Sequence, residues 1–152
     1  QLGLNLVKDH PEAYLSRSIA VVEELKPFAL AGNDIEYANL LWSVGKECRT
    51  QKAYAKALKF HTISLSYSDQ LPANYIGLME SNYFLEDYRA AYHYSKELIR
   101  LHYPSEKRAY EIAIDCALKS NMEGDAIAMM KIYLEKWESA YYQRLIPKEY
   151  AF

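Results

Sequence analysis

Glycine, proline and β-branched residues are scarce in this sequence. Its 152 residues include only 5 glycines and 5 prolines, and valine and threonine are few. β-Sandwiches and barrels need frequent turn clusters and β-branched runs, so these all-β folds are not expected. Hydrophobic residues make up 51% of the chain, whereas disordered chains are poor in them. The chain is therefore expected to fold, and its composition favours helices.

An excess of charge of one sign is also lacking. Lys and Arg number 18 against 20 Asp and Glu, which gives a formal net charge of −2 and a pI near 6.1. A nucleic-acid-binding domain usually carries a basic field, so no nucleic acid partner is expected. Charged residues interrupt every apolar run before the roughly 18 residues that suggest a membrane span, so no membrane partner is expected either.

Cysteine is rare as well. Cys48 and Cys116 are the only two, too few for a structural zinc site or a disulfide framework. They are expected to be small buried apolar side chains. Free cysteines favour a reducing compartment such as the cytoplasm. A chain that begins at Gln1 instead of Met is either processed, as suits an exported or periplasmic protein, or a piece of a longer polypeptide. The compartment therefore stays open.

Apolar residues recur at helical spacing along the chain. Leu41, Val44 and Cys48, three and four residues apart, are one example. The breaks between such runs predict helices at about 11–31, 34–49, 51–67, 72–85, 87–102, 105–120 and 122–138. Pro27 should end or kink the first of them. Short breaks make neighbouring helices antiparallel, so the helices are expected to form hairpins that stack on one another.

The hairpins carry an internal repeat of about 34 residues. Tyr54 and Tyr88 each begin a Tyr-x-x-Ala motif, and the two motifs lie 34 residues apart. A further alanine, Ala126, follows Ala91 by 35 residues. One extra residue is therefore expected near Asn121.

The helices before these motifs keep the same period. Gly45, Met79 and Ala113 are spaced at 34 residues and occupy one position of the repeat, where two of the three are small. These features resemble three degenerate tetratricopeptide repeats, although Met79 replaces the usual glycine of the second repeat and Met122 the tyrosine of the third. The resemblance implies an all-α fold: a right-handed superhelical stack of antiparallel helical hairpins, which is a TPR-like α-solenoid.

The resemblance also divides the chain. It implies an N-terminal helical cap (1–33), three repeats (34–70, 71–103 and 104–138) and a C-terminal segment (139–152) that is either a capping helix or a truncated repeat. This last segment is rich in aromatic residues, whereas the ends of repeat arrays need polar caps. It is therefore expected to be covered by a longer chain or by a second copy in a homo-oligomer.

In such repeats the first helix of each hairpin lines a concave groove. The resemblance places eleven residues of this chain in that groove, and they are predicted to bind a partner protein or peptide. They are Asn39, Trp42, Lys46, Arg49, Ile76, Glu80, Tyr83, Phe84, Lys107, Tyr110 and Ile114. Aromatic residues and arginine are enriched in binding hot spots. For each aromatic residue, burial in the core is the alternative, whereas Lys46 and Arg49 are expected to be exposed because cations are rarely buried.

Some tetratricopeptide proteins hold the C-terminal carboxylate of a chaperone tail with lysine, asparagine and arginine residues. The corresponding positions here are Trp42, Lys46, Gly77, Lys107 and Glu111, and only Lys107 agrees. An apolar helix or an extended peptide is therefore the expected ligand.

Motifs for catalysis are not found. The four histidines lack the His-x-x-x-His spacing that brings metal ligands to one helical face, and no phosphate-binding loop or nucleophile motif occurs. The chain is predicted to be no enzyme, to bind no metal or cofactor, and to act as a protein–protein interaction scaffold. The alternatives are a sensory or regulatory domain of a larger signalling protein, which binds a peptide or small ligand, and an RNA-binding repeat, which the low pI disfavours.

Overall fold

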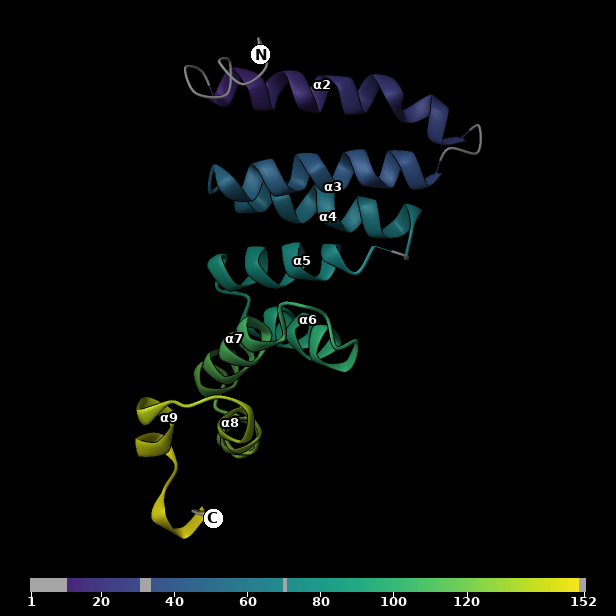
Figure 1. The fold of residues 1–152 in the computed structure, drawn as a ribbon. Coiled ribbons are helices and arrows are strands. Elements are labelled where there is room, and N and C mark those ends of the chain that lie inside the picture. The colour runs from purple at the N-terminus through teal and green to yellow at the C-terminus, as the bar shows by residue number, and fades with distance from the viewer. Residues whose placement is uncertain (1–10, 31–33, 70, 151–152) are drawn as a thin grey trace. The chain divides into compact units, whose positions relative to one another are not determined.

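The computed structural model describes residues 11–30, 34–69 and 71–150, with the backbone alone at residue 11 and residues 28–30. These residues form helices and no strand (Figure 1). The elements are α2 (Pro11–Leu30), α3 (Asp34–Thr50), α4 (Tyr54–Tyr67), α5 (Ala73–Phe84), α6 (Tyr88–Arg100), α7 (Glu106–Lys119), α8 (Glu123–Lys136), α9 (Ala140–Leu145) and the 3₁₀ helix η1 (Lys148–Tyr150). The prediction of an all-α chain is thus confirmed for the described residues.

The helix boundaries follow signals in the sequence. Each predicted helix is present, and its ends lie within a few residues of the prediction. Pro72 and Pro104 lie just before α5 and α7, where a residue without an N–H leaves no helical hydrogen bond unmade. Pro27 lies inside α2, which continues to Leu30, so this proline does not end the helix.

The chain divides into two compact units, residues 1–81 and residues 82–152. The division falls inside α5 and therefore inside the predicted second repeat, residues 71–103. Each unit has its own cluster of buried apolar side chains.

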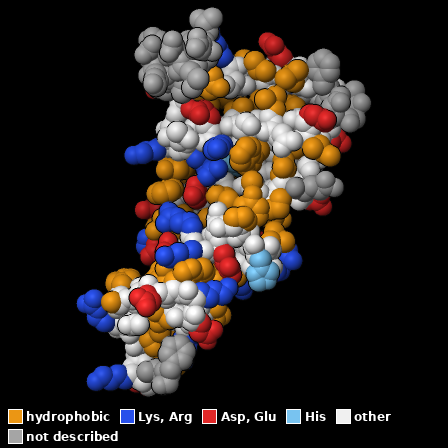
Figure 2. Space-filling view, viewed as in Figure 1, with side chains coloured by type: hydrophobic (Ala, Val, Ile, Leu, Met, Phe, Trp, Pro, Cys, Tyr) orange, Lys and Arg blue, Asp and Glu red, His pale blue; other side chains and the backbone are white. Residues whose placement is uncertain are grey.

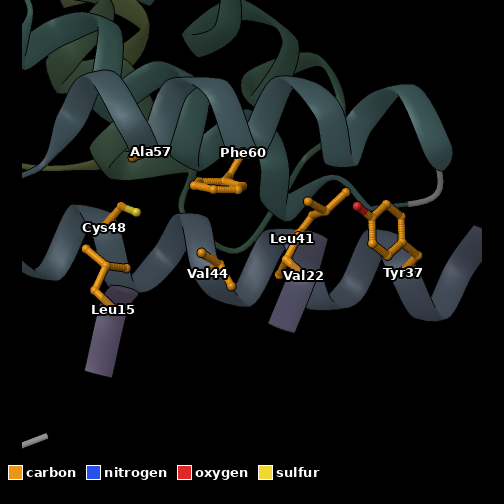
Figure 3. Packing of buried hydrophobic residues seen from close by; sticks show 8 residues of the cluster. All are labelled: Leu15, Val22, Tyr37, Leu41, Val44, Cys48, Ala57 and Phe60. Carbon is orange, nitrogen blue, oxygen red and sulfur yellow. The ribbon is translucent and has the colours of Figure 1, made fainter. Parts of the chain in front are cut away.

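In the first unit, α3 packs against α2 and against α4 (Figure 1). Val22 reaches α3 from α2, and Phe60 reaches it from α4 (Figure 3). Leu41, Val44 and Cys48 of α3 lie between them and are buried. The two covered sides explain why apolar residues recur along α3 every three or four positions.

In the second unit, α7 packs against α6 and α8, and α9 packs against α8. Ile114 of α7 is buried together with Met130 and Tyr133 of α8. The ring of Trp137 lies against that of Tyr133, with 4.9 Å between the centroids. The short helix α9 begins 34 residues after α7, at the place where the next first helix of the repeat is expected.

Three of the turns between consecutive helices have the same conformation. Lys52, Glu86 and Asn121 have φ angles of 59°, 63° and 58°, in the left-handed region that commonly ends a helix. After each, the next N–H donates to the carbonyl five residues earlier, at 2.8, 2.9 and 2.8 Å. The turns are 34 and 35 residues apart. The extra residue lies in the last turn of α7, which ends three residues after Cys116, whereas α3 ends two residues after Cys48.

A buried alanine follows each of these turns. Ala57, Ala91 and Ala126 have no exposed surface, and they begin the second turn of α4, α6 and α8. A side chain this small allows a neighbouring helix to approach closely.

Ala57→Leu and Ala91→Leu should each lower the free energy of unfolding by about 1–3 kcal/mol, because the added carbons have no room between packed helices. Ala55→Leu, at an exposed position of α4, is the matched control and should change it by less than about 0.5 kcal/mol. Urea denaturation followed by circular dichroism measures all three. If Ala57→Leu and Ala55→Leu have the same midpoint, the recurrent alanines do not mark close helix contacts.

Candidate functional site

A stripe of side chains runs along one face of α3. Ile35, Asn39, Trp42 and Lys46 are spaced by three and four residues and therefore share a face. Ile35, Asn39 and Lys46 are exposed, and Trp42 is half-buried. The Lys46 Nζ lies 5.4 Å from the centroid of the Trp42 ring, within range of a cation–π interaction. The Nε1 of Trp42 is buried and has no hydrogen-bond partner in the described part of the chain.

Arg49 continues this stripe, but the prediction that its side chain is exposed is wrong. Only 14% of the side chain is exposed. Its Nη1 forms an ion pair of 2.5 Å with Oε2 of Glu80, and its Nε donates a hydrogen bond of 3.2 Å to Nε2 of His61. Ile76, one turn before Glu80, is half-buried.

His61 lies wholly inside the first unit. Its side chain has no exposed surface, and two glycines face it, Gly45 from α3 and Gly77 from α5. A Cβ added to either glycine would overlap the imidazole ring. The absence of a side chain at these two positions is therefore what leaves room for the ring.

A directed chain of hydrogen bonds passes through His61. Because Arg49 can only donate, Nε2 of His61 accepts and Nδ1 carries the proton. Nδ1 lies 3.0 Å from Oδ1 of Asn74, whose Nδ2 donates to Oγ of Ser64 at 2.8 Å. Ser64 Oγ donates in turn to the carbonyl of Ala38 at 2.6 Å. These hydrogen bonds connect α3, α4 and α5. They also give each of the buried polar groups involved a hydrogen-bond partner.

The imidazole of His61 is held neutral. Burial lowers its pKa to about 4; the hydrogen bond to Asn74 opposes this shift, and the Arg49 guanidinium adds to it. A proton on Nε2 would face the Arg49 guanidinium and remove the acceptor that Arg49 uses. The residue is therefore a structural group of the core rather than a general base near neutral pH.

The second unit carries an aromatic and charged group that we call the Tyr83 cluster: Tyr83, Phe84, Tyr88, Asp115 and Lys119. The Tyr83 hydroxyl donates to Oδ2 of Asp115 at 2.6 Å, and the same oxygen is 3.0 Å from Lys119 Nζ. That ammonium group lies 5.3 Å from the centroid of the Tyr83 ring and 4.8 Å from that of Tyr88. The Phe84 ring meets Tyr83 edge to face at 5.4 Å.

The hydrogen bond to Asp115 raises the pKa of Tyr83, and burial raises it further, so the hydroxyl remains a donor. Asp115 therefore fixes two groups, the Tyr83 hydroxyl and the Lys119 ammonium.

The remaining predicted groove residues divide between surface and core. Lys107 is exposed. Tyr110 and Ile114 are 5% and 1% exposed and belong to the core that α7 shares with α8. α8 covers the face of α7 that carries them, so for Tyr110 the structure shows burial in the core, which was the alternative to exposure.

A cavity of about 400 Å³ lies between α2 and α3 in the first unit. Its lining consists of Tyr14, Arg17, Ser18, Val21, Leu40, Ser43, Val44 and Glu47. The volume falls in the range of small-molecule sites.

Groups for metal binding or thiol chemistry are not assembled in the described residues. There, no three His, Cys, Asp or Glu side chains are grouped so that they could hold a metal ion. Cys48 and Cys116 are free and buried. Burial raises the pKa of both thiols, and it raises the pKa of Cys116 to about 12. Neither cysteine is therefore a reactive thiolate near neutral pH. Within the same residues, none of the helices has the length and apolar character to span a bilayer.

No protein-family model matches this chain, and a search of curated proteins finds no similar sequence.

The sequence indicates only some of the contacts in the Tyr83 cluster. Asp115 and Lys119 have the i, i+4 spacing of a helical ion pair, which indicates their contact with each other. Nothing in the sequence indicates that Tyr83 lies against that pair. The sequence also gives one indication of the packing around His61. A glycine in the middle of a helix, such as Gly77, costs stability, so its presence there indicates that another group approaches the helix closely.

Arg49→Met should lower the free energy of unfolding by about 2–3 kcal/mol, because it leaves the Glu80 carboxylate and the His61 Nε2 without their donor. Lys46→Ala, one turn away at an exposed position, is the control and should change it by less than about 0.5 kcal/mol. Urea denaturation of both variants tests this. Equal midpoints would show that the buried hydrogen bonds of Arg49 contribute nothing.

Stability should fall as the solution is acidified. Between a pKa of about 6.5 in the unfolded chain and about 4 in the folded chain, the unfolded state binds the proton of His61 first, so protonation favours unfolding. Lowering the pH from about 7 to about 5 should reduce the free energy of unfolding by about 2 kcal/mol.

The measurement is urea denaturation across this pH range. His61→Gln should remove most of the pH dependence, whereas His93→Gln, at an exposed position, should keep it. An unchanged slope in His61→Gln would contradict the assignment.

Proposed function

We propose that this chain is a protein–protein interaction module of tetratricopeptide-like hairpins, which binds a peptide or helix of a partner protein on the first helices of the hairpins. Two observations support the repeat: the same hairpin turn recurs after 34 and 35 residues, and a fully buried alanine follows each turn. A right-handed superhelical stack is the arrangement that this repeat class adopts, and it is part of the proposal.

Exposed Phe84 is the observation that carries the proposed function. Its side chain is large and apolar, yet 48% of it is exposed. It packs on Tyr83, whose hydroxyl is anchored to Asp115. Because this support is already ordered, a partner that covers Phe84 has little further side-chain entropy to remove. Aromatic anchors of this kind carry much of the energy of protein interfaces.

Trp42 supports the same function in the first unit. Its buried indole N–H has no acceptor among the described residues, and an unpaired buried donor costs stability. The part of the Trp42 ring that stays accessible can contact a bound peptide. The neighbouring Lys46 and Asn39 are exposed and can contact polar groups of the same peptide.

The charges of the surface favour a protein over a nucleic acid. On the face shown in Figure 2, Lys and Arg side chains are interspersed with Asp and Glu side chains. A nucleic acid would need a field of positive sign, whereas protein interfaces combine aromatic anchors with mixed polar groups. An apolar helix or an extended peptide is therefore the proposed ligand.

Capture from the native source tests the function. The wild-type chain, Phe84→Ala, Trp42→Ala and the control Leu101→Ala serve as baits, and mass spectrometry quantifies the captured proteins. Leu101 is 38% exposed but lies in the turn between α6 and α7. At least one captured protein should be depleted about tenfold or more by Phe84→Ala or Trp42→Ala, as expected for hot-spot residues, and retained by Leu101→Ala. Identical sets of proteins for all four baits would refute the proposal.

A sensory or regulatory domain remains the second candidate, because the cavity between α2 and α3 is large enough for a small molecule. Binding there would stabilise the folded first unit and raise its melting temperature.

A further inference from the structure

A groove between α6 and α8 in the second unit lies apart from the Tyr83 cluster. Its volume is about 310 Å³, and Tyr110 of α7 is among the residues that line it. Lys96 and Ile99 contribute from α6, and Asp125, Met129 and Ile132 contribute from α8. The three α8 residues are spaced by four and three positions and so form a stripe on one face of that helix.

Several residues that line the groove are apolar. Ile99 and Met129 are half-buried, and Ile132 is 40% exposed. A stripe of apolar side chains beside a hollow of this size marks a surface that another helix can cover.

Charged residues line both sides of this groove: Lys96 and Arg100 on α6, and Asp125 on α8. Lys96 on α6 lies over the ring of Tyr92, 5.4 Å from its centroid, and Asp125 lies on α8. Neither forms an ion pair with any residue in the described part of the chain. By contrast, the neighbouring Arg100 and Lys136 are paired with Glu97 and Glu106, at 2.8 and 2.6 Å.

We propose that this groove binds α8 of a second copy of the chain in a two-fold symmetric dimer. In such an interface each contact occurs twice with the two copies exchanged. One unpaired cation and one unpaired anion on the same surface can then satisfy each other: Lys96 of each copy meets Asp125 of the other. The α8 stripe with Ile132 of each copy covers the apolar lining of the other groove.

Charge complementarity favours a second copy over other occupants. A partner segment of one sign would pair with Lys96 or with Asp125 and repel the other residue. The second copy presents both signs on the same surface, as the two-fold arrangement requires. This proposal does not depend on the function of the Tyr83 cluster or of Trp42.

Analytical ultracentrifugation of the full chain from about 1 µM to about 1 mM tests the proposal. The wild type should form a dimer as its concentration rises, and added salt should weaken the dimer. Lys96→Glu and Asp125→Lys should each raise the dissociation constant roughly tenfold or more, because two attractive pairs become two repulsive ones. The double variant Lys96→Glu/Asp125→Lys should return to within about threefold of the wild type.

Two further variants complete the experiment. Lys59→Glu, at an exposed position of α4, is the control and should leave the dissociation constant unchanged. Ile132→Ser should weaken the dimer as strongly as the charge reversals, and it decides the question if a charge variant fails to fold by circular dichroism. A wild type that stays monomeric at every concentration would overturn the proposal. Dimerisation that Ile132→Ser leaves unchanged, or that the double variant does not restore, would also overturn it.

Discussion

The His61 ring fills the space that Gly45 and Gly77 leave between α3, α4 and α5. A ring of this shape fits only if both helices present a residue without a side chain at the contact. Its two nitrogens then connect Arg49 to Asn74 through hydrogen bonds. Each of these bonds has a direction, so the three helices can be combined in few ways that keep the polar atoms around His61 paired. The arrangement of α3 and α5 around α4, and with it the position of the α3 stripe, depends on this fit.

The packing of the helices also holds some side chains at the surface in fixed positions. α7 uses one face for the core, through Ile114, and places Asp115 and Lys119 on a different face. Asp115 then holds Tyr83, and Tyr83 supports the exposed Phe84 ring. A partner that binds there, as proposed, would meet an aromatic surface that is already ordered, and the entropy lost on binding would be correspondingly small.

Much of the fold could be predicted from local features of the sequence. Proline before α5 and α7 and the apolar spacing within α3 depend on neighbouring residues only, because a helix and its ends are decided within a few turns. The Tyr-x-x-Ala motifs gave the spacing of the hairpins to within one residue, and the additional residue lies in the last turn of α7. The exposure of Lys46 could be predicted as well, because cations are rarely buried. For Phe84 the sequence left exposure and burial open, and the structure shows it exposed.

The sequence by itself determined that the described part of the chain is helical, where each helix begins and ends to within a few residues, and which side chains share a face of one helix. These features follow from the period of 3.6 residues and from local signals such as proline. Only the tertiary structure decided which face is covered. Arg49 and Tyr110 have the same sequence signal as the exposed Lys46 and Phe84, yet Glu80 and His61 enclose the first and α8 covers the second. The covering groups lie 12 to 31 residues away from Arg49, and no local pattern specifies that they meet. Burial depends on contacts between distant helices, and those contacts form only when the helices pack.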